Sequence, residues 1–267
     1  MLSATATITY QGQAYQFNPL QPLDISLPLQ AGPDNVNCFW AEPVQVDTIV
    51  VGSFVGSVAL GGSTNYQRVH LTPHGNGTHT ECYGHISPDP AATLDKCLSR
   101  FLFVAQVVSV TPQQQENGDL VVMASDVIAQ LSVENLPEAL VLRTLPNLDA
   151  KRTAQYSGTN PTYIEPALAH FLADNDVEHL LLDLPSVDRE EDGGALLAHH
   201  AFWQYPETTR IASTITELIF VPDAVADGWY LLNLQVTSLV LDASPSKPVL
   251  YTLTPATNSE GALPSLH

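Results

Sequence analysis

Two short, uninterrupted apolar runs constrain the fold of this chain more than any other feature. Residues 139–144 (ALVLRT) and 179–184 (HLLLDL) are too short for typical helices and have the continuous apolar character of strands buried on both faces. Between them, residues 164–175 show the apolar spacing of a helix, with Pro166 near its first turn, where proline is tolerated. Strand, helix and strand in this order predict a βαβ unit and therefore a parallel pair of strands.

The other apolar segments mostly predict strands. Residues 5–16 alternate polar and apolar side chains, which indicates an edge hairpin with Gly12 at its turn. The β-branched segment 48–60 predicts a buried strand that bends at its glycines. Further strands are expected at 101–110, 120–123, 211–221 and 228–242, and a short helix at 125–131. Together these elements predict one strand-rich α/β domain over residues 1–267.

The charge of the chain excludes several classes of partner. There are 9 Lys and Arg residues against 28 Asp and Glu residues, and the formal net charge is −19. So few basic residues cannot form the positive surface that a phosphate backbone requires, so we expect no nucleic-acid partner. The same shortage argues against anionic membrane surfaces, and no apolar run is long enough to span a bilayer. We therefore expect no membrane partner either.

The first residues and the cysteines indicate a compartment. The chain starts without the basic and apolar regions of a secretory signal. Cys38, Cys82 and Cys97 are odd in number and follow no disulfide framework, so free thiols are expected. Both observations favour a cytoplasmic protein.

Four of the nine histidines lie close together, at positions 70, 74, 79 and 85. If the backbone there is extended, His79, Glu81 and His85 project from one face because they share parity. Two imidazoles and a carboxylate on one side suit zinc, manganese or iron. The glycines after His74 would let the backbone turn or bulge, which brings this residue to the same place. The alternative is a solvated, histidine-rich loop, and for His70 alone a structural or pocket-lining role is expected.

The spacing of this segment resembles the signature of the cyclase family of metal-dependent hydrolases, which includes bacterial kynurenine formamidase and isatin hydrolase. That signature is His-x-Gly-Thr-His-x-Asp-x-x-x-His, and the matching positions here are His74, Gly77, Thr78, His79, Glu81 and His85. Two departures stand out. One extra residue lies between His74 and Gly77, and Glu81 replaces an aspartate. They leave open whether His74 is a ligand and whether one or two ions bind.

The resemblance implies further site residues later in the chain. Two adjacent histidines follow the expected strand at 179–184, and alignment with the family favours His199 over His200 as a ligand. Glu217, in an apolar segment, matches the ligand glutamate of the family; its alternative is an exposed position on an edge strand. The resemblance covers about residues 40–240, with 1–40 as N-terminal strands or an arm. It implies a swivelling β/β/α fold, with a mixed central sheet or barrel-like β core flanked by helices.

The implied activity is hydrolysis of a carbon–nitrogen bond in a small amide, formamide or cyclic imide. A metal ion lowers the pKa of its bound water and polarises a carbonyl. The implied ligands, for one or two zinc or manganese ions, are His74, His79, Glu81, His199 and Glu217. His85 is the implied proton donor, unless it is itself a ligand. Phe39, Trp40 and His200 are candidates for substrate contact, although the aromatic pair is equally typical of a core.

Two other functions fit the same residues. An ester or lactone hydrolase could use the same site. A non-catalytic protein that binds a metal or a small molecule is the alternative from a different class, and the two departures from the signature leave this alternative open. Serine hydrolase chemistry is not indicated, because the sequence has no Gly-x-Ser-x-Gly motif. The resemblance further implies a homodimer or homotetramer that acts on a small-molecule substrate.

Overall fold

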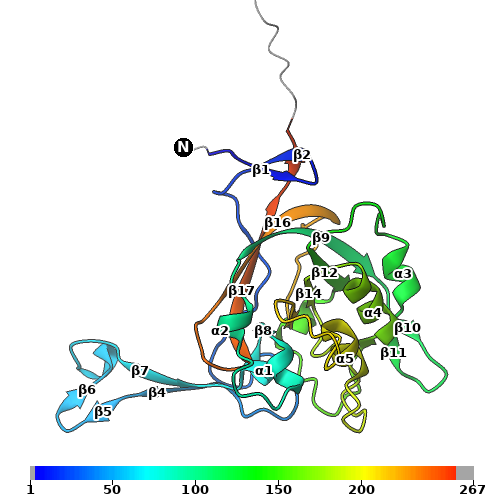
Figure 1. Ribbon diagram of the computed structural model, residues 1–267. Coiled ribbons are helices and arrows are strands. Elements are labelled where there is room, and N and C mark those ends of the chain that lie inside the picture. Colours follow the sequence, from blue (N-terminus) through cyan, green and yellow to red (C-terminus); the bar gives the residue numbers. More distant parts are fainter. Residues whose placement is uncertain (1–3, 257–267) are drawn as a thin grey trace, which may run out of the picture.

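A sheet that closes on itself forms the centre of the computed structural model, which describes residues 4–256 (Figure 1). In pairing order its strands are β16 (Gly228–Val236), β9 (Leu102–Val110), β12 (Ala139–Thr144), β14 (His179–Leu182), β15 (Thr214–Glu217), β8 (His79–Glu81) and β17 (Ala243–Thr252). Because β17 also pairs with β16, the sheet closes into a barrel, and β3 (Leu23–Asp24) adds to β17. This mixed, closed sheet confirms the predicted barrel-like β core.

Four neighbouring strands of the barrel are parallel: β9, β12, β14 and β15. Helix α4 (Pro166–Asp174) connects β12 to β14, so the predicted βαβ unit is confirmed, with Pro166 in the first turn of the helix. Strand β8 runs antiparallel to β15 and places His79 opposite Glu217. The beginning of β8 therefore meets the carboxyl ends of the parallel strands, where open α/β sheets commonly bind ligands.

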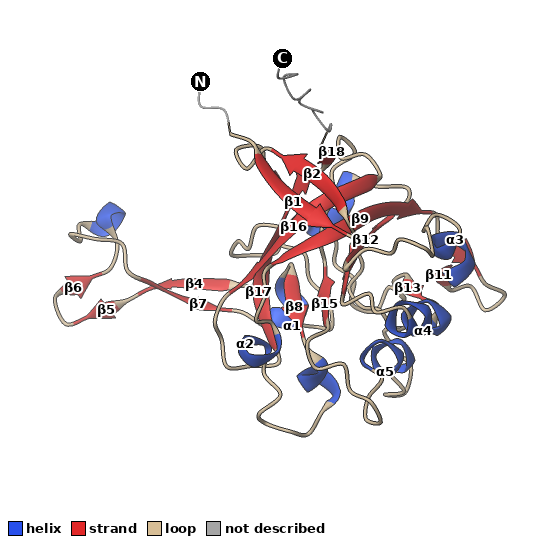
Figure 2. Cartoon of the chain, turned by 45° about the horizontal axis from the view of Figure 1, so that its top comes forward, coloured by secondary structure: helices blue, strands red, loops and turns tan. Residues whose placement is uncertain are grey.

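Alternate side chains of the barrel strands enter two different cores. In β12, Ala139 and Val141 belong to the core inside the barrel, whereas Leu140 and Leu142 belong to the core outside it. The outer core includes residues of α3 (Ala124–Ile128), α4 and α5 (Leu197–Trp203), which cover one side of the barrel (Figure 2). This two-sided burial explains why the central strands are apolar at every position.

The remaining elements are short and lie around the barrel. The predicted hairpin is confirmed, because β1 (Ala6–Tyr10) and β2 (Gln13–Phe17) pair across Gly12, and β18 (Thr254–Pro255) joins β2. A second small sheet consists of β10 (Gln113–Gln114), β11 (Leu120–Val122) and β13 (Tyr163–Ile164). The single turns are α1 (Pro73–Asn76), α2 (Leu94–Cys97), and the 3₁₀ turns η1 (Val58–Leu60), η2 (Tyr83–Ile86) and η3 (Asp149–Thr153).

The prediction of a buried strand at 48–60 is wrong, because this segment belongs to an arm, residues 45–70, that projects from the barrel (Figures 1 and 2). In the arm, β4 (Gln45–Thr48) pairs with β7 (Gln67–His70), and β5 (Val50–Val51) pairs with β6 (Phe54–Val55). The side chains of β5 are exposed, at 60% for Val50 and 68% for Val51. Apolar, β-branched composition favours a strand, but it does not determine which other elements cover that strand.

The C-terminal strands also differ from expectation. The strand predicted at 228–242 ends at Val236, and the strand predicted at 211–221 is shortened to β15. Strand β17 follows at Ala243 and was not predicted, because Pro245 and Pro248 lack the N–H groups that a central strand normally donates.

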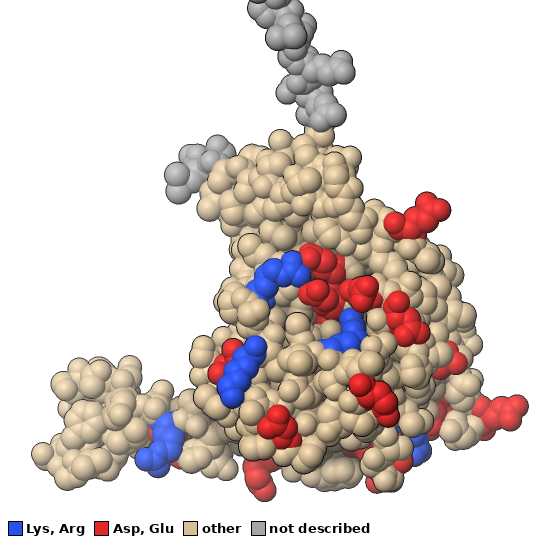
Figure 3. Space-filling view, in the orientation of Figure 1, with Lys and Arg blue, Asp and Glu red and all other residues tan. Residues whose placement is uncertain are grey.

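The surface agrees with the composition. Acidic side chains outnumber basic ones on the face in Figure 3, and the arm carries few charges. All three cysteines are buried and free, as predicted. Within residues 4–256, every helix is too short or too polar to cross a bilayer.

Candidate metal centre

Three segments that are distant in the sequence bring polar side chains to one end of the barrel. They are the segment from α1 to η2, the helix α5 and the strand β15. The side chains are His74, His79, Glu81, His85, His199 and Glu217. The structure therefore brings together all six residues predicted as ligands or proton donor.

The motif segment is not one extended strand. Strand β8 contains His79 and Glu81, whose shared face agrees with the parity argument. The strand ends there, and His85 reaches the site from the 3₁₀ turn η2. His74 lies on α1, a single helical turn that begins at Pro73, rather than on a bulge. The expectation that His85 shares the strand face is thus wrong, although the chain reversal after Cys82 still returns it to the site.

Glu81 lies at the centre of the cluster, and its side chain is only 1% exposed. One carboxylate oxygen, Oε1, is 3.2 Å from His199 Nε2. The other, Oε2, is 3.5 Å from His74 Nε2 and 3.7 Å from His85 Nδ1. Burial would raise the pKa of Glu81, but the charge of His85 and the hydrogen bond with His199 outweigh it and lower the pKa to about 2. The carboxylate is thus held in its ionised form.

His79 and Glu217 form a second pair beside Glu81. His79 Nδ1 is 2.9 Å from the carbonyl oxygen of Gly77, so this nitrogen is the donor and Nε2 presents its lone pair. His79 Nε2 lies 3.3 Å from Glu217 Oε2. The backbone N–H of Val187 donates to Glu217 Oε1 and fixes the carboxylate. Glu217 is therefore buried in a central strand rather than exposed on an edge.

The unpaired nitrogens test whether these residues fit a metal ion. Among residues 4–256, His74 Nε2 and His79 Nε2 have no hydrogen-bond partner, although each lies within 3.5 Å of a carboxylate oxygen. In both pairs the imidazole nitrogen and the carboxylate oxygen are close together but are not aligned for a hydrogen bond. This arrangement is expected when both atoms are directed at the position of one metal ion. Two groups have ligand atoms within 4.8 Å of one another: His74, Glu81 and His85, and His79, Glu81 and Glu217. The residues fit a divalent ion, because zinc and manganese accept such mixed donors.

His199 is oriented by Asp188. The Nδ1 atom of His199 lies 2.6 Å from Asp188 Oδ2, and the backbone N–H groups of Ala198 and His199 also donate to this carboxylate. Burial would lower the pKa of His199, but the bonds to Asp188 and Glu81 outweigh it and raise the pKa to about 10. Metal-binding histidines are commonly held in this way by an outer carboxylate. Asp188 lies outside the histidine motif and was not singled out in the sequence as a site residue.

The backbone is strained beside two of these residues. Leu196, which precedes α5, has φ of +45°, and Leu218, which follows Glu217, has φ of +55°. Left-handed backbone at a non-glycine residue costs roughly 1–2 kcal/mol, so the surrounding structure must hold both positions. Such outliers are concentrated at functional sites.

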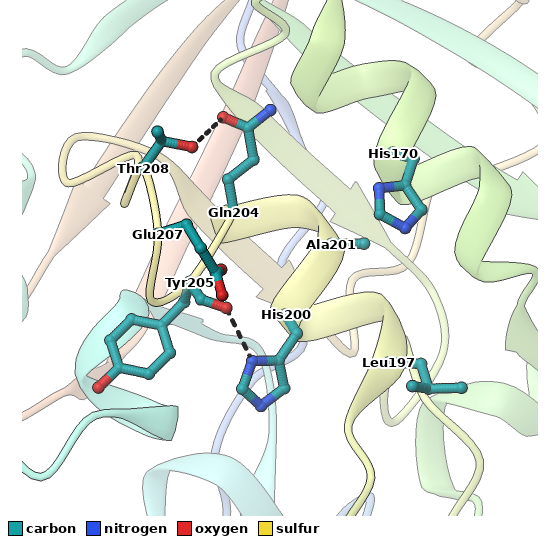
Figure 4. Close-up of a pocket in the computed structure, with 8 residues that line it drawn as sticks. All are labelled: His170, Leu197, His200, Ala201, Gln204, Tyr205, Glu207 and Thr208. Carbon is teal, nitrogen blue, oxygen red and sulfur yellow. Dashed lines mark hydrogen bonds between the residues drawn. The ribbon is translucent and has the colours of Figure 1, made fainter.

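Of the three residues predicted to contact substrate, only Phe39 lies in the wall of the cavity beside the cluster. A cavity of about 290 Å³ opens above the cluster, and Phe39 is part of its wall. Trp40 lies outside that wall, with 64% of its surface exposed. His200 lines a different pocket together with His170 and Glu207, and its Nδ1 donates to the carbonyl oxygen of Tyr205 (Figure 4). His199, not His200, therefore faces the site.

Asp242, in the loop before β17, was not singled out in the sequence. Its Oδ2 atom lies 3.0 Å from His74 Nε2 and 3.4 Å from His85 Nδ1. The close contacts with these two imidazoles, first His74 and then His85, lower the pKa of Asp242 far below its ordinary value. Asp242 is a lone carboxylate at the end of the apolar run Leu239 to Leu241, and its apolar surroundings, like those of Glu217, are a signal that could have found it.

Comparison with known protein families agrees with this geometry. A family model described as "Putative cyclase" matches residues 10–189. The chain belongs to the cyclase family. Among curated relatives of this cyclase, a kynurenine formamidase from Polaromonas naphthalenivorans (strain CJ2) is 28% identical over 197 residues, which cover 74% of this chain and 79% of that protein. The resemblance inferred from the histidine motif is thus confirmed.

Solved structures share the fold of this cyclase. Isatin hydrolase A from Ralstonia solanacearum has a TM-score of 0.66 at 13% identity, covering 86% of this chain and 91% of its own. Isatin hydrolase A from Labrenzia aggregata, bound to benzyl benzoate, has a TM-score of 0.65 at 12% identity, with coverages of 86% and 93%. A predicted metal-dependent hydrolase from Bacillus stearothermophilus scores 0.58 at 16% identity, with coverages of 86% and 98%.

Proposed function

We propose that this cyclase is a metal-dependent hydrolase that cleaves a carbon–nitrogen bond of a small amide, formamide or cyclic imide. The observation that supports it most strongly is the pair of unpartnered nitrogens, His74 Nε2 and His79 Nε2, each beside a buried carboxylate. The similarity to a kynurenine formamidase supports the same class of reaction. The shared fold with isatin hydrolases is compatible with it.

The chain would hold one or two zinc or manganese ions between two imidazole–carboxylate groups that share Glu81. When bound, such an ion supplies an acidified water and polarises a carbonyl group. Asp188 keeps His199 Nε2 directed at Glu81, and the N–H of Val187 keeps Glu217 in place. These outer contacts set the donor geometry before substrate arrives.

His85 is positioned to transfer a proton. Its side chain is 30% exposed and is part of the cavity wall. The charge of Glu81 is the largest influence on the pKa of His85 and raises it above its ordinary value, which favours the protonated imidazole. A protonated imidazole in this place can donate a proton to a departing nitrogen, which an amide requires in order to break.

The part of the cavity wall that lies outside the metal cluster would select the substrate. Phe39 and Leu196 supply apolar surface, and Arg189 and Glu190 supply charge. Arg189 Nε donates a hydrogen bond to Asp119 Oδ2 at 3.0 Å. Asp119 lies in the polar turn before β11, so this turn contributes indirectly to the pocket. Loops of this kind commonly determine specificity.

The proposal is tested by measuring bound metal and turnover in the same preparation. We expect one or two zinc or manganese ions per chain by inductively coupled plasma mass spectrometry, and hydrolysis of an aryl formamide that stops with a chelator and returns with metal. A panel of amides, esters and lactones separates the alternatives. Bound metal with no turnover of the panel would contradict the enzyme assignment and favour a binding protein.

A matched pair of variants tests the site. His79→Ala should lose metal and activity, whereas His200→Ala should keep both, because His200 faces the pocket in Figure 4. A His79→Ala protein that retained metal and turnover would refute the placement of the centre.

A further inference from the structure

We propose that Asp242 is a direct ligand of the ion that His74 binds, a role that the histidine motif does not contain. This inference rests on the proposed metal centre. Asp242 Oδ2 lies 3.0 Å from His74 Nε2 and 3.4 Å from His85 Nδ1. Two donors about 2.1 Å from one ion lie about 3.0 Å apart at octahedral angles and about 3.4 Å apart at tetrahedral angles. The distance between Asp242 Oδ2 and His74 Nε2 is therefore compatible with two donors that share an ion.

The contact with His74 is not a hydrogen bond. His74 Nε2 has no hydrogen-bond partner among the described residues, even though Asp242 Oδ2 is its nearest carboxylate oxygen. A carboxylate that merely oriented His74 would accept a proton from the imidazole in line. The misalignment leaves the lone pair of the nitrogen and the carboxylate oxygen free to converge on a third atom.

The backbone holds Asp242 in this place. Its carbonyl oxygen accepts from the N–H of Cys82 at 3.0 Å, and the next residue, Ala243, pairs with Glu81 across β17 and β8. Gly84 allows this close approach, since a Cβ there would lie 3.1 Å from Asp242 Cβ. Asp242 and Glu81 are therefore fixed relative to one another by the sheet.

The extra carboxylate is consistent with the two departures of the motif. The inserted residue after His74 and the longer side chain of Glu81 alter the first donor group, and His74 Nε2 is farther from Glu81 (3.5 Å) than from Asp242 (3.0 Å). With Asp242 included, His74, Glu81 and Asp242 supply three donors at the His74 end of the centre, which leaves the fourth position of a tetrahedral ion for water and His85 free to transfer a proton.

The test is spectroscopic and does not depend on activity. A thiolate bound to Co²⁺ gives an intense near-ultraviolet charge-transfer band. We expect this band in the Co²⁺-loaded Asp242→Cys protein and not in the native protein or in an Asp149→Cys control, whose position is exposed. In parallel, Asp242→Asn should bind the ion at the His74 end at least tenfold more weakly in calorimetric titration, and Asp149→Asn should not.

The outcomes separate this inference from the proposed function. If the native chain binds no divalent ion, the metal centre itself fails. If the native chain binds ions, but Asp242→Cys shows no charge-transfer band and Asp242→Asn titrates like the native chain, only the role of Asp242 is refuted. Weakened binding by Asp242→Asn without the band would also refute direct ligation, because it would indicate a positioning role.

Discussion

The strands of the metal centre and those of the arm reverse the usual relation between polarity and burial. Strands β8 (HTE) and β15 (TITE) are mostly polar and completely buried. Strand β5 (VV) is wholly apolar and exposed. The difference lies in their neighbours, because β8 pairs with strands on both sides, whereas β5 pairs only with β6. Burial in this protein follows from pairing and partner groups rather than from hydropathy.

The polar strands tolerate burial because their side chains are partnered. The hydroxyls of Thr80 and Thr216 bond each other at 2.8 Å across β8 and β15. His79 and Glu217 face each other in the same register, on the other side of the sheet. The arm has no such requirement, since its polar backbone and its apolar side chains both face solvent in the isolated chain.

The largest expected effect is a loss of metal affinity, and it comes from a substitution in the buried polar strand β8. Glu81→Gln removes the carboxylate common to both donor groups, so ion affinity should fall by more than the roughly 10–100-fold typical of outer contacts. Calorimetric titration with zinc or manganese measures this loss. Glu116→Gln, an exposed change of the same kind, should bind like the native chain. Unchanged affinity in Glu81→Gln would mean that the buried carboxylate is structural.

The stability of the metal-free protein should depend on pH in a direction set by the same cluster. The pKa of His199 is raised to about 10 from 6.5, so its contribution is complete below pH 6.5 and is lost as pH rises towards 10. The pKa of Glu81 is lowered to about 2 from 4.5, so its contribution is lost as pH falls from 4.5 towards 2. Thermal unfolding should therefore show maximal stability of the metal-free chain between these two losses.

Added metal should change the high-pH side of that profile. Because metal ions compete with protons for the same donors, stabilisation by zinc or manganese should increase with pH while the metal-free stability decreases. A metal-free profile that rises steadily from pH 6.5 to 9.5 would contradict the charged state assigned to His199.

A smaller effect is expected where the buried strands meet. Thr216→Val leaves the hydroxyl of Thr80 unpaired, which should lower the free energy of unfolding by about 1–3 kcal/mol. Urea denaturation measures this difference. The double variant with Thr80→Val should recover part of the loss, because neither hydroxyl is then left without a partner. No recovery would mean that the two hydroxyls do not act as a pair.

The smallest effect on the free energy of unfolding is expected in the arm, where valine is replaced by threonine instead of threonine by valine. Val51→Thr replaces an exposed apolar side chain by a polar one, and the free energy of unfolding should change by no more than about 0.5 kcal/mol. The same urea experiment compares it directly with Thr216→Val. A loss as large as that of Thr216→Val would show that Val51 is covered in the folded protein.

Local patterns were sufficient for the central part of the fold and for most of the candidate site. The apolar runs 139–144 and 179–184 predicted the parallel strands β12 and β14, because burial on both faces leaves a signal in every residue. The histidine motif contained residues from His74 to His85, which the structure brings together. Pairing between distant strands was harder to predict from the sequence. The two prolines of β17 argued against a strand that is in fact part of the barrel. The β-branched residues of the arm predicted a core strand that is in fact exposed.

By itself, the sequence determined which chemical groups are available: imidazoles and carboxylates at fixed short spacings, few basic residues, and a βαβ unit. Only the tertiary structure decided that Asp242 joins His74 and His85, that His199 rather than His200 faces the cluster, and that residues 45–70 leave the barrel. The physical reason is that spacing along a chain defines the face of a single element. Which faces then meet depends on closure of the barrel, and closure is a property of pairings between residues far apart in the sequence.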